Sequence, residues 1–159
     1  MKELLGLLEK NSRYDVEQLA VMLGKSTEEI KAAIKKLEDE KVIIGYKTLI
    51  DWEKTDRDAV TALIEVKVTP QRGEGFEKIA ERISRFPEVK SCFLMSGGFD
   101  LTVIIEEKTL KEVALFVAEK LAVLDSVIST STHFVLKKYK DYGTIFAQEE
   151  KDDREVVVL

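Results

Sequence analysis

The hydrophobic residues of this chain change their period near residue 59, and that change constrains the fold more than any other feature. Before it, apolar residues recur every three or four positions, which is the spacing of amphipathic helices. From Val60 to Val68 they occupy every second position, which is the spacing of a strand with one buried face. The 159 residues therefore predict two small domains, the first helical and the second a mixture of helices and strands.

Residues 1–51 predict three short helices in a helix-turn-helix arrangement. The second helix is expected to begin after Asp15, a residue type that caps helix N-termini, and to end at Gly24, which tolerates a positive φ. Ser26 and Glu29 then have the spacing of a capping box for the third helix. A plain three-helix bundle would show the same periodicity, but the short turn between the second and third helices favours the DNA-binding form.

The segment after the third helix predicts a wing and then a linker. Residues 42–50 alternate loosely around Gly45, which indicates two short strands, and Tyr46 is expected to pack within them. Residues 52–58 are polar and charged, as is typical of a linker, and Trp52 is expected to pack this linker against one domain. The N-terminal domain is therefore expected to be a winged helix-turn-helix.

Residues 59–138 predict an α+β domain. Its first strand is expected to end at Pro70 and Gly73. The remaining expected elements are a helix carrying Phe76, Ile79, Ala80, Ile83 and Phe86, strands over 89–96 and 99–106, a helix over 110–124 with Val113, Ala114, Val117 and Leu121 facing inward, and a strand over 127–136. The order βαββαβ is the ferredoxin-like plan, with both helices on one face of an antiparallel sheet.

The other face of this sheet has no helix to cover it. Leu63, Phe93 and Val103 are expected to make that face partly apolar. Because an exposed apolar face usually has a partner, we expect the chain to associate with itself as a homodimer or larger homo-oligomer.

The formal net charge of −5 argues against a strongly basic protein that coats nucleic acid. Much of that charge lies in residues 139–159, where six acidic and three basic side chains give −3, while residues 1–52 carry only −1. We expect the extension to be mobile beyond Phe146, although Val156-Val157-Val158-Leu159 offers an apolar end that a neighbour could accept. The overall charge therefore does not exclude a local DNA-binding face.

The chain has a single cysteine, Cys92, which excludes an internal disulfide and CxxC metal or redox motifs, so we expect the protein to lie in a reducing cytoplasm. Cys92 itself is expected to be a small residue of the core. No apolar run approaches the length of a membrane-spanning helix, and we expect no membrane partner. His133, the only histidine, is interpreted as a surface residue, with a weak pH switch or a catalytic acid as alternatives. No catalytic constellation and no cofactor are expected.

The third helix is the candidate DNA-reading element. Hydroxyls at its N-terminus can donate to phosphate, and its lysines can neutralise the DNA backbone. Ala32 can contact a thymine methyl and Glu28 can accept from cytosine N4. A solvated helix face would show the same mixture of glutamate and lysine. With two further phosphate contacts outside the helix, the predicted DNA-binding residues are Arg13, Ser26, Thr27, Glu28, Lys31, Ala32, Lys35, Lys36 and Lys47.

The Gly97-Gly98 hairpin is the second candidate site. Glycines permit positive φ and close backbone approach, so this turn can offer N–H groups to a carboxylate, and Asp100 can pair with an α-ammonium group. A simple tight hairpin capped by Asp100 is the alternative. The residues of this candidate ligand site are Met95, Ser96, Gly97, Gly98, Phe99, Asp100, Thr130 and Thr132.

The order and spacing of these segments resemble the leucine-responsive regulator/AsnC (Lrp/AsnC, feast/famine) family of transcription regulators. The resemblance extends to Lys138 and is carried by Asn11-Ser12-Arg13, Leu19-Ala20, Gly24-Lys25-Ser26, Ile30, Leu37-Glu38, Val42-Ile43-Ile44-Gly45-Tyr46, Phe86-Pro87-Glu88-Val89, Ser96-Gly97-Gly98-Phe99-Asp100 and Thr130-Ser131-Thr132. It implies a DNA-binding domain, a RAM-type ferredoxin-like domain that senses an amino acid or related metabolite where dimers meet, and octamers.

The chain departs from this family at the recognition helix. Family members commonly carry arginine near Ala32 and Ala33, and glycine where Lys41 stands. Two alternatives therefore remain. One is an enzyme similar to siroheme decarboxylases, with His133 as its acid, and the other is a sensing and oligomerisation module that has lost DNA binding.

Overall fold

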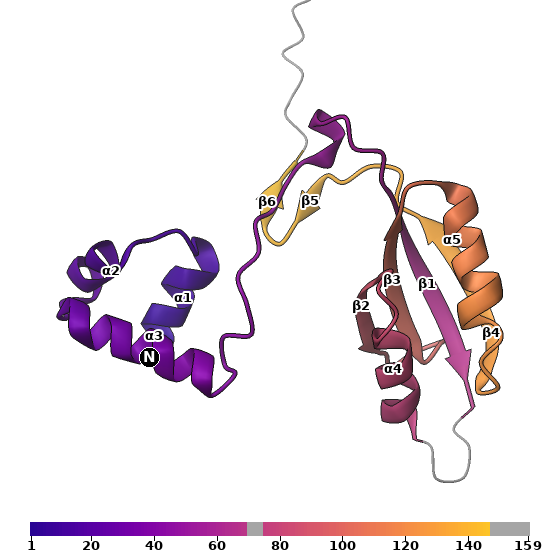
Figure 1. The fold of residues 1–159 in the computed structure, drawn as a ribbon, viewed down its shortest axis with the longest axis horizontal. Helices are drawn as coiled ribbons and strands as arrows, with labels where there is room; N and C mark the ends of the chain where they lie inside the picture. Colours follow the sequence, from indigo (N-terminus) through magenta and orange to yellow (C-terminus); the bar gives the residue numbers. More distant parts are fainter. Residues whose placement is uncertain (70–74, 147–159) are drawn as a thin grey trace, which may run out of the picture. The chain divides into compact units, whose positions relative to one another are not determined.

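The computed structural model describes residues 1–69 and 75–146, which separate into two units, Met1–Ile50 and the part that begins at Asp51 (Figure 1). Each unit has its own hydrophobic core. The expected strand end at Pro70 and Gly73 and the expected features of the tail beyond Phe146 lie outside the described residues. Within the described ranges, no helix combines the length and the apolar character needed to cross a membrane.

The N-terminal unit consists of three helices: α1 (Lys2–Lys10), α2 (Val16–Leu23) and α3 (Thr27–Asp39). The predicted caps are confirmed. Asp15 and Gln18 form a reciprocal capping box on α2, and Ser26 and Glu29 form one on α3. The helices pack around a core of Leu4, Leu19, Ala20, Ile30 and Leu37.

Both α2 and α3 end in the same backbone motif. After α2, Gly24 has a φ of 61°, and the N–H of the next residue, Lys25, donates to the carbonyl of Ala20 at 3.0 Å. After α3, Lys41 has a φ of 57°, and the N–H of Val42 donates to the carbonyl of Leu37 at 2.9 Å. This hydrogen bond and the left-handed residue before it define the Schellman motif.

The expected two-stranded wing is wrong for this chain, because residues 42–50 form no strand. An isolated pair of such short strands is not stable without a third strand or a packed face. The segment is held instead by α3. The N–H of Ile43 donates to Leu37 O at 3.0 Å, and the Tyr46 hydroxyl donates to Glu38 Oε1 at 2.9 Å.

The second unit is the predicted ferredoxin-like fold. It contains β1 (Val60–Val68), α4 (Phe76–Ser84), β2 (Val89–Leu94), β3 (Leu101–Glu107), α5 (Leu110–Phe116), which continues as the π-helical turn η2 (Val117–Leu121), and β4 (Val127–Phe134). The antiparallel sheet has the order β2-β3-β1-β4. The 3-10 helix η1 (Trp52–Lys54) precedes it, and the short strands β5 (Lys140–Asp141) and β6 (Thr144–Ile145) follow it.

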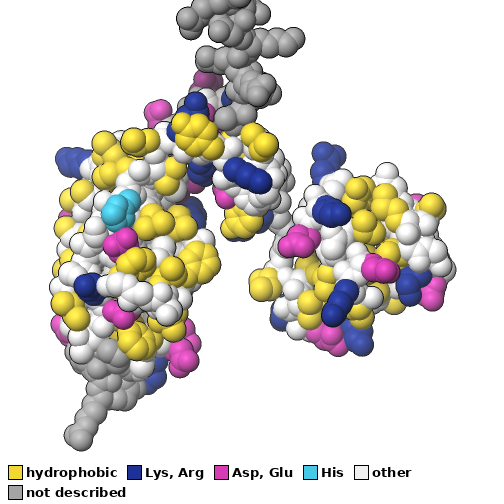
Figure 2. Space-filling model, turned by 180° about the vertical axis from the view of Figure 1, so that it is seen from behind, with side chains coloured by type: hydrophobic (Ala, Val, Ile, Leu, Met, Phe, Trp, Pro, Cys, Tyr) yellow, Lys and Arg dark blue, Asp and Glu magenta, His cyan; other side chains and the backbone are white. Residues whose placement is uncertain are grey.

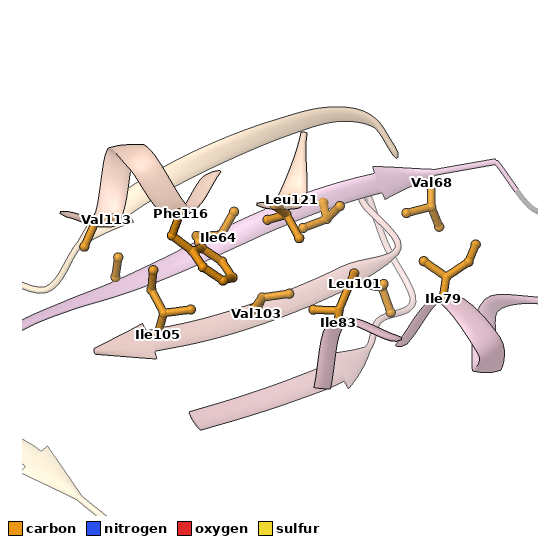
Figure 3. Packing of buried hydrophobic residues seen from close by; sticks show 12 residues of the cluster. Ile64, Val68, Ile79, Ile83, Leu101, Val103, Ile105, Val113, Phe116 and Leu121 are labelled. Atoms are coloured by element: carbon orange, nitrogen blue, oxygen red, sulfur yellow. The ribbon is translucent and has the colours of Figure 1, made fainter. Parts of the chain in front are cut away.

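The core lies between the sheet and the helices α4 and α5 (Figure 3). Ile64 on β1 pairs with Val103 on β3, so both side chains point to the helices. The expectation that Val103 belongs to the opposite face is therefore wrong, and Ile104 lies there instead. On α5, Ala114 is exposed and Phe116 is buried, contrary to the prediction. A helix advances about 100° per residue, which places Ala114 at the margin of the inner face that Val113 defines.

The open face of the sheet carries apolar side chains that none of the described helices covers (Figure 2). Leu63 and Ile104 are directly paired and half-buried, and Phe93 is 51% exposed on the edge strand. His133 lies opposite Leu63 on this face, and its Nε2 is 3.4 Å from Glu65 Oε1. In Figure 2 hydrophobic side chains and an acidic side chain lie next to this histidine.

Residues 52–58 are attached to the second unit. The Arg57 guanidinium lies 4.2 Å from the ring centroid of Trp52 and forms an ion pair with Glu106 of β3. Trp52 is half-buried beneath it. Cys92 packs against the core, and burial raises the pKa of its thiol.

Candidate nucleic-acid interface and effector loop

The outer face of α3 exposes most of the predicted DNA-contacting side chains. Glu28, Lys31, Ala32, Lys35 and Lys36 are all exposed, whereas Ile30 and Leu37 hold the opposite face in the core. Because the core contacts prevent rotation of the helix, these five side chains project together from one surface. Lys36 Nζ also lies 3.8 Å from Oε1 of Glu40, the residue that follows α3.

The N-terminus of α3 is less suited to phosphate than predicted. The Ser26 hydroxyl accepts from the Glu29 N–H at 3.2 Å and donates to Glu29 Oε2 at 3.0 Å, so the capping box engages it. The Thr27 side chain, the second hydroxyl predicted to contact phosphate, is half-buried. Two carboxylates, those of Glu28 and Glu29, stand where a phosphate would have to approach the helix end.

Hydrogen bonds favour the ionised form of both of these carboxylates. The pKa of Glu28 lies below its ordinary value, chiefly because the carboxylate accepts from its own backbone N–H and then from the Thr27 hydroxyl. The pKa of Glu29 is lowered chiefly by the Ser26 backbone N–H and then by the Ser26 hydroxyl. The first turn of α3 is therefore anionic at neutral pH.

The other two predicted contacts lie outside α3. Arg13 is exposed in the turn between α1 and α2, where its backbone N–H donates to Asn11 Oδ1 at 3.0 Å. Lys47 is exposed in the segment that follows α3. The α2–α3 turn also exposes Lys25, directly before Ser26, a cation that the helix periodicity alone does not single out.

The loop predicted to bind an effector is longer than a tight hairpin. It spans residues 95–100 between β2 and β3 and is closed by the Met95 N–H, which donates to Asp100 O at 2.8 Å. Neither Gly97 nor Gly98 has a positive φ, so that expectation is wrong. A loop of six residues reverses the chain without left-handed residues. A Cβ at either glycine would meet no atom within 4 Å, so both stand in open space.

Asp100 is fixed at the end of β1. Its Oδ2 accepts from the Val68 N–H at 2.8 Å, and its own N–H donates to Val66 O at 3.0 Å. The side-chain bond forms where the pairing of β1 with β4 shifts register between Lys67 and Val68. The carboxylate therefore accepts from a backbone donor of β1 at this irregularity, whereas the alternative considered for it was to cap the turn of a tight hairpin.

Thr130 and Thr132 lie on the helix-covered side of β4, opposite Val66 and Ile64, and both are half-buried. Leu101, the residue after Asp100, and Thr130 pair with Val66 from its two sides, which places the backbones of Asp100 and Thr130 about 10 Å apart at two strand spacings. Thr132 is two residues, or about 7 Å, further from the loop. The structure thus brings Thr130 closer to the loop than Thr132.

Hollows along α4 lie apart from the predicted effector residues. One of about 130 Å³ is lined by Lys78, Ile79, Glu81, Arg82 and Arg85, and another of about 420 Å³ lies beside it. The loop over residues 95–100 lines neither of them.

A helix-turn-helix unit followed by a ferredoxin-like unit defines a DNA-binding regulator with an attached ligand-binding domain. The family model that matches residues 61–145 is described as the Lrp/AsnC ligand binding domain. The uncharacterized HTH-type transcriptional regulator YugG of Bacillus subtilis is 54% identical over 156 residues, which cover 98% of this chain and 94% of that protein. The chain therefore belongs to the Lrp/AsnC family and is a DNA-binding transcription regulator.

More distant relatives agree with this assignment. The proline dehydrogenase transcriptional activator of Rhizobium radiobacter is 28% identical over 89% of this chain and 90% of its own length. A transcriptional regulator of Neisseria meningitidis, solved in complex with L-methionine, is 25% identical with a TM-score of 0.70, covering 87% of this chain and 88% of its own. Escherichia coli AsnC, at 19% identity, shares the fold with a TM-score of 0.65 over 85% of this chain and 89% of its own.

Proposed function

We propose that this protein regulates transcription by binding double-stranded DNA through α3 and an amino acid or related metabolite through the loop over residues 95–100. The observation that carries the proposal is a doubly capped α3 that turns three lysines away from its core in a member of the Lrp/AsnC family. We assign DNA binding to residues 1–51, linkage to 52–58, and effector binding and assembly to 59–138. A DNA partner also favours a cytoplasmic location.

The lysines of α3 are the proposed phosphate-binding residues. Lys31, Lys35 and Lys36 are exposed beyond the anionic first turn, and their ammonium groups act as point charges toward phosphate. Arg13 and Lys47 supply further contacts outside the helix. Because residues 1–52 have a net charge of −1, one domain alone provides little electrostatic affinity. Several domains in one assembly must engage together.

The effector site is proposed where the loop approaches Thr130. Asp100 retains an oxygen for an ammonium group, and the exposed backbone of Gly97 and Gly98 can approach a carboxylate closely. The Neisseria meningitidis relative was solved with L-methionine, which has both groups. Gly97 and Gly98 stand in open space, so we propose that a second copy completes the site where dimers meet in an octamer.

Self-association is proposed through the open face of the sheet. Leu63, Phe93 and Ile104 would leave water if a second sheet packed against them. Such an isologous contact would give the homodimer from which an octamer is built.

DNA binding is tested by fluorescence anisotropy with labelled duplexes that cover the region upstream of the gene. Wild-type protein should bind at low salt, and Lys35→Glu should bind at least tenfold more weakly, because a phosphate contact becomes a repulsion. Lys10→Glu on α1 is the control, since it makes the same change in charge on the same unit. Equal affinity of all three proteins would support a module without DNA binding through α3.

We propose no enzymatic role, since the relatives are named transcriptional regulators. His133, the acid that the siroheme-decarboxylase-like alternative requires, is exposed on the open sheet face beside Glu65. An absorbance change of an added tetrapyrrole on titration with the protein would favour that alternative.

A further inference from the structure

The exposed face of α3 has an acidic and apolar centre between basic margins. At about 100° per residue, Glu28 and Ala32 follow one line along the helix, opposite the buried side. Lys31 and Lys36 lie on either side of that line, about 140° apart around the axis. If α3 lies in the major groove of DNA, the residues of this central line would meet base edges. The two marginal lysines would then face the phosphates on the two sides of the groove.

The carboxylate at the leading end of this line cannot be a phosphate contact. Glu28 is exposed, and hydrogen bonds from its own backbone and from Thr27 favour its ionised form. It accepts hydrogen bonds and donates none. The approach of this carboxylate to DNA is therefore unfavourable unless a base supplies a hydrogen-bond donor. The contribution of Glu28 to DNA affinity thus depends on the base sequence of the DNA.

The major groove offers two amino donors, cytosine N4 and adenine N6. On adenine the amino group stands beside the N7 acceptor, which repels a carboxylate, whereas cytosine has no acceptor next to N4. Ala32 follows Glu28 by one helical turn, about 6 Å or two base steps, and its methyl group suits a thymine methyl.

We propose that Glu28 is the specificity-determining residue of α3 and selects cytosine in the major groove. This inference rests on the proposed binding of DNA through α3. Lys31 and Lys36 then position the helix on the backbone, and Glu28 rejects base pairs that present no donor at that place.

The test is selection of duplexes from a random-sequence pool by the full-length protein, followed by sequencing. Wild type should enrich a motif with an invariant cytosine. Glu28→Gln should enrich adenine at that position, because a carboxamide pairs bidentately with adenine N6 and N7. Preference for cytosine over adenine in fixed duplexes should fall by roughly tenfold to a hundredfold.

Glu17→Gln is the matched control. Glu17 occupies on α2 the same second helical position that Glu28 occupies on α3, it is exposed, and its replacement makes the same change in charge. This variant should keep the wild-type motif. A motif that Glu28→Gln leaves unchanged would overturn the role of Glu28 alone. Failure of the wild type to enrich any motif would overturn DNA recognition itself, and this inference with it.

Discussion

Lys41 occupies after α3 the same left-handed position that Gly24 occupies after α2. Their φ angles are 57° and 61°, and in both motifs the following N–H donates to a helical carbonyl five residues earlier. A side chain with a Cβ is disfavoured in this conformation, whereas glycine is not. The chain thus keeps at Lys41 a backbone geometry for which glycine is the usual residue.

Replacement of Lys41 by glycine should stabilise the N-terminal unit. Relief of the left-handed conformation is partly offset by the greater freedom of glycine in the unfolded chain, so we expect a gain of about 0.5–1 kcal/mol. Urea unfolding followed through amide signals of α3 measures it. Lys41→Ala removes the same charge but retains a Cβ, and it should give no comparable gain. Equal stabilisation by both variants would assign the effect to charge.

The reverse experiment is Gly24→Ala. No atom lies within 4 Å of a Cβ built at Gly24, so the expected loss of about 1 kcal/mol arises from backbone conformation and not from a clash. The same unfolding measurement applies. An unchanged unfolding midpoint would show that the turn adapts without strain.

Asp100→Ala should loosen the junction of the loop with β1. The substitution leaves the Val68 N–H, now bonded to Asp100 Oδ2 at 2.8 Å, without its acceptor, and the loss is expected to be about 1–3 kcal/mol. Hydrogen exchange at the Val68 amide should accelerate. Asp125→Ala, on an exposed turn, is the control and should leave that amide protected. Unaltered exchange in Asp100→Ala would contradict a structural role for this carboxylate.

Acid should weaken the N-terminal unit through the first turn of α3. The pKa values of Glu28 and Glu29 lie below their ordinary 4.5, so the stability that they contribute is present above about pH 4.5 and is lost as the pH falls through their folded-state values. Urea midpoints of α3 between pH 6 and pH 3 measure this loss. Glu29→Gln should reduce the loss, while Glu17→Gln should not reduce it to the same extent. If the urea midpoints of wild type, Glu29→Gln and Glu17→Gln fell in parallel with pH, the loss of stability would not arise from the first turn of α3.

The open sheet face should control assembly. Phe93→Glu places a charge within the proposed interface and should reduce the mass measured by light scattering. Leu110→Glu is a matched control, because Leu110 on the α5 side is about as exposed as Phe93, at 57% against 51%. Retention of the wild-type mass by Phe93→Glu, or an equal loss in both variants, would locate the interface elsewhere.

Local signals in the chain were sufficient to predict most elements. Asp15, Gly24 and Ser26 act within a few residues of themselves, and their caps and turns form as expected. The alternation from Val60 to Val68 likewise predicts the buried face of β1. Residue chemistry indicated the candidate sites, but exposed lysines and a glycine pair are common on ordinary surfaces, so the family resemblance was needed to favour a functional interpretation.

The pairing of segments that are distant in the chain could not be predicted from these local signals. Val103 faces the helices because its neighbour across the sheet is Ile64, and a one-residue change in register would reverse that direction. Asp100 is held by Val68, 32 residues away in the chain. The segment over residues 42–50 has the pattern of strands but no partner strand within residues 1–69 and 75–146. Hydrophobic periodicity and helix capping depend on residues close together in the chain, so a single segment is enough to predict them. Strand register, the face of the sheet on which a side chain lies, and loop geometry depend on contacts that exist only after the segments pack.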